Sequence, residues 1–293
     1  MRMPGWLRGL VLHRLPLAVA TVLAGGLLSA SLVRYAPGFA TDERLLDARL
    51  SDESRDSIRT AASAEQDVVK YYLGSLQRAL HGDLGTSRSM NRPVRELVAE
   101  RSGVTLALLA RALSLVWFAT LLLAFLASSS SRSRWVEGPV TLLSGALLCL
   151  PAAVMALLCV LLNQPAYLAL ALILFPKVYR YAATLIANTR EMPHVVTARA
   201  KGLSPARVFF WHILPAANRE LLALAGISIS LAIGAAIPVE ALCSLPGLGQ
   251  LAWQSALGRD LPVLITVATL IIVCVVLANS GADVLAGAKE QPA

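Results

Sequence analysis

The residues best suited to chemistry in this sequence form a basic segment at positions 197–204, between Pro193 and Pro205. Arg199 and Lys201 lie there among small residues and Gly202, while the sequence on either side is strongly apolar. Cationic side chains on a polar segment can pair with acidic groups of another protein. The segment is therefore predicted to be a docking element for a partner protein.

No residues are spaced for catalysis or for metal binding. The cysteines lie far apart in apolar surroundings and are interpreted as small buried hydrophobic residues: Cys149, Cys159, Cys243 and Cys274. The histidines do not pair at metal-ligand spacing: His13, His81, His194 and His212. Because Ser-His-Asp, paired-carboxylate and H-E-x-x-H arrangements are also missing, neither a metal site nor enzymatic activity is expected.

Motifs that bind nucleotides are also missing. The sequence has no G-x-x-x-x-G-K-[ST] motif, which would cradle the phosphates of ATP. Residues 247–252 match the loose pattern G-x-G-x-x-A, but they follow no strand and open no βαβ unit. A turn and a re-entrant or interfacial helix are predicted there. The chain is expected to bind no cofactor itself, so ATP could act only on a separate chain.

The composition indicates a membrane protein. Hydrophobic residues make up 56% of the 293 residues and charged residues 15%, and the mean hydropathy is +0.64. A soluble fold with so little charge would expose large apolar patches. The net charge of +8 does not indicate nucleic acid, because the basic residues lie at the ends of apolar runs.

Six apolar stretches are predicted to span the membrane as helices. They cover residues 15–33, 103–127, 139–162, 166 to about 181, 221–237 and 261–286. Pro151 predicts a kink in the third, and Pro176 lies within the fourth. Small residues in the first and last stretches, including Gly25, Gly26 and Ala282, favour close helix packing.

The polar interval from residue 34 to residue 101 is predicted to be a small extramembrane cap. Apolar residues recur at helical spacing between residues 65 and 80, and Gly82 and Gly85 then favour a turn. Arg92-Pro93-Val94 begins a further helical stretch that leads into the second span.

Lysines and arginines in the short loops predict the orientation. With both termini in the cytoplasm, the inner loops hold most of these cations, while the outer connection at 163–165 holds none. Segment 197–204 then faces the cytoplasm. A cleaved signal peptide is the rival interpretation of the first stretch, because Ser29-Ala30-Ser31 resembles a cleavage site, but the stretch exceeds the usual length.

Four groups of residues form a recognisable pattern. In chain order they are Tyr35-Ala36-Pro37-Gly38; residues 82–87 with Arg92-Pro93-Val94; TARAKGLS at 197–204 with His212 and Leu214-Pro215; and Val239-Glu240 with residues 246–249 and 259–263. These groups resemble bacterial ABC-importer permeases, most closely the peptide and nickel permease branch. Together they extend from the first span to the last.

The resemblance implies an all-α integral membrane protein of type I ABC-importer permease architecture, with six transmembrane helices and an extracytoplasmic helical cap after the first. Residues 1–101 would form the first span and the cap, residues 102–287 a five-helix permease core, and residues 288–293 a cytoplasmic tail. A slim coupling helix at about residues 193–205 would dock into an ATPase subunit. Its docking residues would be Thr197, Ala198, Arg199, Ala200, Lys201, Gly202, Leu203 and Ser204, with His212, Leu214 and Pro215 downstream.

The same resemblance implies several partners in the bacterial inner membrane. They are ABC ATPase subunits carrying ATP and Mg, a second and different permease subunit, an extracytoplasmic solute-binding protein, and membrane lipid. Di- or oligopeptides are the expected solute, and nickel or another small solute is the alternative.

Two residues are weaker candidates for the solute pathway or a subunit interface. Arg111 lies inside the second span, where a charge costs roughly 2.5–3.5 kcal/mol or more. Glu240 ends the fifth span and suits a cap or an interface better than acid catalysis.

Two features depart from the family pattern, namely Val196-Thr197-Ala198 in place of Glu-Ala-Ala and the short connection at 163–165. A secondary transporter and a polytopic membrane enzyme remain open, although the carboxylates or nucleophiles that they need are not visible.

Overall fold

The computed structural model describes residues 15–34, 68–129 and 133–287. Within these residues the fold is helical, apart from an isolated antiparallel bridge between Thr86 and Pro93, so the predicted all-α class is confirmed. The chain divides into two compact units, residues 1–102 with 251–274 and residues 103–250 with 275–293. The Tyr35-to-Gly38 motif and the predicted tail at 288–293 lie outside the described residues.

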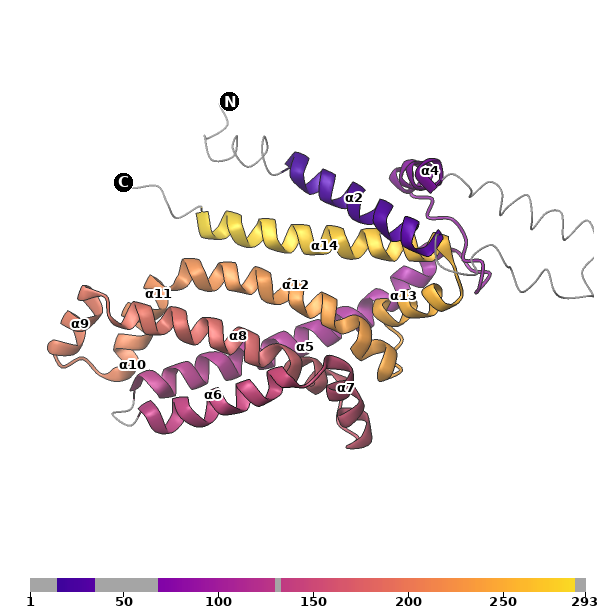
Figure 1. The fold of residues 1–293 in the computed structure, drawn as a ribbon. Helices are drawn as coiled ribbons and strands as arrows, with labels where there is room; N and C mark the ends of the chain where they lie inside the picture. Colours follow the sequence, from indigo (N-terminus) through magenta and orange to yellow (C-terminus); the bar gives the residue numbers. More distant parts are fainter. Residues whose placement is uncertain (1–14, 35–67, 130–132, 288–293) are drawn as a thin grey trace, which may run out of the picture. The chain divides into compact units, whose positions relative to one another are not determined.

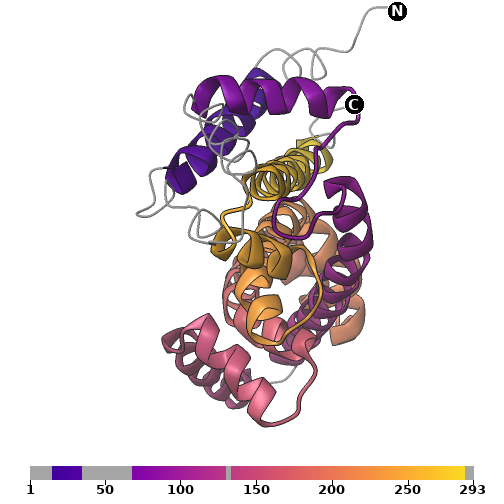
Figure 2. The same cartoon turned by 90° about the vertical axis from the view of Figure 1, so that its right-hand side faces the viewer.

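The first unit contains α2 (Leu15–Arg34), α4 (Val68–Leu80) and the first part of α14 (Leu261–Gly287). Figures 1 and 2 show α4 crossing α2 instead of running alongside it. Small residues permit this contact, as predicted: a Cβ at Gly26 would collide with the Tyr72 ring, and one at Gly25 would lie 2.7 Å from Ile272. The buried Tyr72 hydroxyl donates to the Val22 carbonyl over 3.2 Å.

A tight hairpin follows α4, as the two glycines predicted. Gly82 and Gly85 have φ values of 82° and 74°, which favour glycine. The Asp83 carboxylate accepts from the Gly85 N–H at 2.9 Å, and the Ser87 N–H donates to the Arg92 carbonyl at 2.9 Å. The hairpin leads directly into α5 (Val94–Ser129).

The second unit is built around α8 (Ala166–Arg190), whose apolar sequence packs against α6 (Ser133–Cys149), α7 (Ala152–Leu161) and α12 (Asn218–Leu242). Figure 1 shows α6, α8 and α12 side by side. The cluster between them includes Leu170, Leu174 and Val178, which are almost fully buried. α8 runs nine residues past the predicted end at Tyr181, because its last turns still bury Ala182, Ile186 and Thr189.

Pro151 breaks the third apolar stretch instead of kinking it, which corrects the prediction. α6 and α7 are bent by 100° at this point. Proline has no N–H for the carbonyl four residues earlier, and its ring disfavours the helical conformation of Leu150. Pro151 itself is extended, with φ −60° and ψ 143°. The pair is therefore a broken span or a re-entrant segment.

The short connection between α7 and α8 is a compact helix end. Asn163 has φ 51°, and the Gln164 N–H donates to the Cys159 carbonyl at 2.8 Å while the Asn163 N–H donates to the Val160 carbonyl at 3.0 Å. This pair of bonds is a Schellman motif, in which asparagine tolerates the left-handed position. Pro165 then begins α8 without a long loop.

α12 (Asn218–Leu242) extends beyond the predicted span of 221–237 at both ends. A turn at residues 243–244 and α13 (Leu248–Leu257) follow, so a helix is present at the predicted residues, while its re-entrant or interfacial position stays a prediction. In the second unit, Gly226 of α12 leaves no room for a Cβ beside Ala282 of α14, and the Ser230 hydroxyl donates to the Asn279 side-chain oxygen at 3.0 Å. Close packing at Ala282 is thus confirmed.

Four of the described helices are long and apolar enough to cross a membrane: Val94–Ser128, Ala166–Arg190, Asn218–Leu242 and Leu261–Ala282. The bent pair α6 and α7 would make a fifth. α2 has 20 residues with a shorter apolar part at Val19–Ser29, so six spans and the extracytoplasmic cap remain predictions. α5 has 36 residues, or about 54 Å, and exceeds a hydrocarbon core of about 30 Å.

The prediction that all cysteines are buried is wrong. Cys159 is buried, but Cys149 and Cys274 are exposed on the single chain. Apolar neighbours in the sequence do not distinguish a helix face that packs on protein from one that faces lipid. All four cysteines are free thiols.

Candidate docking site

The basic segment begins as helix α9 (Pro193–Ala200) but does not stay helical to Pro205, which corrects the predicted range. Pro193 occupies the first helical turn, where its missing N–H costs nothing. Gly202 has φ 74°, and its N–H donates to the Arg199 carbonyl at 2.9 Å while the Leu203 N–H reaches the Ala198 carbonyl at 3.4 Å. The motif glycine therefore terminates the helix in a Schellman motif and does not slim it.

One face of α9 packs against other elements of the second unit. Val195 and Ala198 are buried in a cluster with residues from α5, α8 and the segment after α9: Ala124, Ile186, Val208, Phe209 and Ile213. Leu203, just beyond the helix end, packs against the same cluster. Ala198 therefore faces the interior, so its small size serves internal packing and not a partner's groove.

The opposite face of α9 is exposed. At 100° per residue, the positions facing away from Val195 and Ala198 are Pro193, Val196, Thr197 and Ala200. All four are exposed, and the Thr197 hydroxyl donates to the Pro193 carbonyl at 2.8 Å. The centre of this outer face is thus small and apolar, although it belongs to the basic segment.

Cations flank the outer face on both sides. Arg199 lies on one side and Lys201 on the other, and both are exposed. Partial burial and the positive charge of the nearby Arg190 lower the pKa of Arg199. Arg190 also forms an ion pair with Glu137 of α6, with Nη1 and Oε1 3.7 Å apart. A carboxylate on a partner would stabilise the charge of Arg199 against these two costs.

The residues downstream of α9 form an irregular helical path to α12. Ser204 precedes α10 (Pro205–Val208), which continues as the π-helical turn η3 (Phe209–Ile213) and then α11 (Leu214–Ala216). His212 lies in η3, and Leu214 and Pro215 begin α11. The predicted signature residues therefore lie between α9 and α12.

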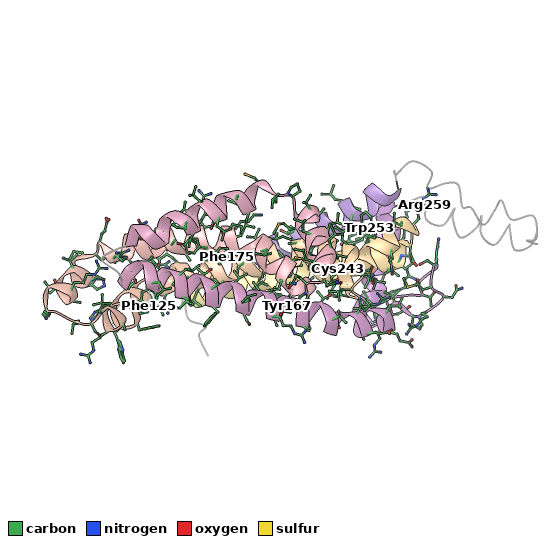
Figure 3. The ribbon with its side chains drawn as sticks, turned by 90° about the horizontal axis from the view of Figure 1, so that it is seen from below. Phe125, Tyr167, Phe175, Cys243, Trp253 and Arg259 are labelled. Carbon is green, nitrogen blue, oxygen red and sulfur yellow. The ribbon has the colours of Figure 1, made fainter. Side chains whose placement is uncertain are left out.

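Aromatic rings attach this path to α5. Phe125 lies at the end of α5 that meets α9 and α10, as Figure 3 shows. Its ring centre is 5.3 Å from that of Phe209 and 5.7 Å from that of Phe210. Offset and edge-on aromatic pairs at these distances stabilise a contact beyond simple burial. Sequence reasoning missed η3, because a π-helical turn has no distinctive residue pattern.

Glu240 is completely buried at the end of α12. Its carboxylate accepts from the N–H groups of Gly249 and Gln250 at 2.6 and 3.3 Å, so it caps the start of α13. A Cβ at Gly247 would collide with this carboxylate, and one at Gly249 would lie 2.6 Å from the Ile237 Cα. Because Gly247 and Gly249 have no side chains, the Glu240 carboxylate has room to cap α13.

Arg111 is exposed on α5. A pathway or interface role for Arg111 or for Glu240 stays a prediction.

A second buried carboxylate, Asp260, was not singled out from the sequence. It lies in the first unit and accepts from the Ser87 and Ser89 hydroxyls at 2.6 and 2.8 Å and from the Ser89 N–H at 3.0 Å. These bonds join two of the family-like motifs, at residues 82–87 and 259–263. In the sequence analysis, these two motifs were related only by their order along the chain.

Comparison with known proteins decides the family. The model described as "Binding-protein-dependent transport system inner membrane component" matches residues 103–291, more than half of the chain. The chain belongs to this family. It is therefore a multi-pass membrane protein and a permease subunit of an ABC importer, and permeases of this family are not themselves enzymes.

Several similar proteins are named as permeases of peptide transport systems. The provisionally named peptide transport system permease protein of Brucella abortus (strain 2308) is 30% identical over 296 positions, covering 87% of this chain and 88% of the relative. The oligopeptide transport system permease protein AppB of Bacillus subtilis (strain 168) is 25% identical over 305 positions, covering 94% and 96%. The di/tripeptide transport system permease protein DppB of Pseudomonas aeruginosa (strain UCBPP-PA14) is 38% identical over 94 positions, covering 32% and 28%.

Proposed function

We propose that this permease imports peptides and that α9 is the element through which a separate ATPase subunit drives it. The observation that carries the proposal is the outer face of α9. A small apolar surface at Pro193, Val196, Thr197 and Ala200, bordered by Arg199 and Lys201, suits insertion into a groove with acidic edges.

The attachment of α9 supports a mechanical role. Its inner face shares a cluster with Ala124 of α5 and Ile186 of α8, and the chain continues through η3 into α12. A displacement of α9 by a nucleotide-dependent partner would be passed to these helices, because a close-packed cluster moves as a body. The permease would then alternate between inward-open and outward-open states, provided that the ATPase binds α9 differently in each.

The remaining parts of the assembly follow from the family. A second, different permease subunit would complete the pathway, and an extracytoplasmic binding protein would deliver the solute. Peptides are proposed as the solute because the relatives are named for peptide transport. Competition of labelled dipeptide uptake by unlabelled peptides, and not by nickel, would support this choice, and the reverse result would contradict it.

The docking role is tested by co-purification. A tag on the permease should recover an ATP-hydrolysing subunit from membranes of cells that express the whole transporter. Ala200→Glu, in the centre of the outer face, should reduce this recovery about tenfold or more, because it places an unpaired charge in an apolar contact. Ala256→Glu is the matched control, since Ala256 is an exposed alanine on α13. Full recovery and full uptake with Ala200→Glu would refute docking at α9.

A further inference from the structure

A cavity of about 650 Å³ lies within the first unit, and α9 contributes no residue to it. Its walls come from α4, from the hairpin after it, from Val98 of α5 and from the first half of α14. The hairpin runs beside the start of α14 (Figure 2), and Ser87 and Ser89 hold it there through Asp260. No part of the proposed function uses this cavity.

The wall contributed by α14 is one continuous helical face. It consists of Pro262, Ile265, Thr266, Thr269, Leu270 and Val273, which recur every three or four residues. The 11 steps from Pro262 to Val273 extend about 16 Å along the helix. Because this part of α14 belongs to a candidate membrane span, the cavity follows the span for about half of a hydrocarbon core of about 30 Å.

Two arginines also line the cavity. Arg78 of α4 and Arg88 of the hairpin line it together with Asp83, which gives two positive charges against one negative charge. The Asp83 carboxylate is already engaged by the Gly85 N–H at 2.9 Å. Arg78 and Arg88 are exposed, and Leu76, which also lines the cavity, packs against the cluster of Tyr72, Leu261 and Ile265. The lining therefore combines two cationic side chains with the mainly apolar face of α14.

We propose that this cavity binds an anionic phospholipid. The phosphate would lie at Arg78 and Arg88, since guanidinium groups suit phosphate oxygens, and an acyl chain would lie along the α14 face. Burial of the chain supplies affinity, and the two arginines select an anionic headgroup over a zwitterionic one. The lipid would join α4 and the hairpin to α14, so it is a structural ligand and not the transported solute.

The test uses the purified whole transporter, stripped of lipid in detergent and titrated with phosphatidylglycerol or phosphatidylcholine, with bound lipid counted by native mass spectrometry. The wild type should bind phosphatidylglycerol about tenfold more tightly than phosphatidylcholine. The double variant Arg78→Gln with Arg88→Gln should lose this preference, because both cations contribute to the binding of an anionic headgroup. Arg95→Gln is the control, since Arg95 is an exposed arginine of α5 outside the cavity wall.

A second variant tests the apolar face of α14 that lines the cavity. Thr266→Trp would fill the space beside Ile265 and Leu270 and should weaken phosphatidylglycerol binding about tenfold while the arginines remain. If Thr266→Trp does not assemble, the arginine pair alone decides. Equal affinity for both lipids, an unchanged preference in the arginine variant, or displacement of the lipid by glycerol 3-phosphate would each overturn the proposal.

Discussion

Gly202 shows how one residue defines the shape of the proposed docking segment. Its φ of 74° lies in the region where glycine has no steric penalty, and it ends α9 immediately after the exposed Ala200. The segment TARAKGLS is thus a short helix followed by a fixed turn. This geometry determines how far α9 projects before the chain returns through α10 and η3.

Gly202→Val should impair coupling without removing the permease from the membrane. A β-branched residue at this φ costs about 1–2 kcal/mol, so the helix end should rearrange. Peptide uptake and ATPase recovery should both fall, while immunoblotting of membranes shows a normal protein level. Gly202→Asn should retain most of the activity, because asparagine tolerates the left-handed conformation. Gly82→Val is the control, because it introduces the same backbone strain at a φ of 82° in the first unit. Undiminished uptake with Gly202→Val would show that this turn is not needed.

Glu240 is the second informative residue, because a buried carboxylate must be offset by hydrogen bonds. Glu240→Ala should remove the acceptor of the Gly249 and Gln250 N–H groups and leave an empty volume beside Gly247. We expect the free energy of unfolding to fall by about 2 kcal/mol or more, since buried donors without partners are costly. Thermal unfolding in detergent should show a lower midpoint for Glu240→Ala than for Glu191→Ala, which changes an exposed glutamate. Equal midpoints would contradict the capping role.

At the scale of elements, prolines and left-handed residues decide where the apolar helices stop. Pro176 is tolerated inside α8, whereas Pro151 separates α6 from α7. The sequence is apolar on both sides of Pro151, so the direction of the chain changes inside a continuous apolar stretch. The π-helical turn η3 similarly redirects the chain between α9 and α12 while remaining apolar.

Pro151→Ala should straighten the α6–α7 pair. Alanine restores a backbone N–H for the Leu147 carbonyl, which favours a continuous helix. Leu142 and Leu161, both highly exposed, are suitable sites for spin labels after the four cysteines are replaced. Their Cα separation should rise from about 18 Å in the bent pair towards about 28 Å in a straight helix. Pro139→Ala, within α6, should leave the distance unchanged. An unchanged distance in Pro151→Ala would assign the bend to packing against α8.

At the scale of the whole molecule, the distribution of lysine and arginine predicts that α9 lies in the cytoplasm. Added trypsin should therefore cleave after Arg199 or Lys201 in inside-out vesicles and not in sealed cells. Mass spectrometry of the fragments identifies the cut. An externally added protease that cuts at these residues in intact cells would reverse the topology and remove α9 from reach of a cytoplasmic ATPase.

The sequence by itself determined the class of the molecule. Apolar stretches, cations at their ends and a missing ATP-binding motif require no tertiary information, because they reflect transfer into a bilayer and local chemistry. The motif TARAKGLS and its companions indicated the family, and Gly82, Gly85 and Gly202 lie at turns as glycines with positive φ should.

Only the tertiary structure decided which side of each helix is used. Ala198 and Ala200 are the same residue two positions apart, yet one packs against Phe209 and the other is exposed. Asp260 meets Ser87 across 173 residues, and Pro151 breaks a span that composition alone would carry through. Such contacts depend on how distant helices pack, and hydrophobicity, which has no direction, does not encode that packing locally.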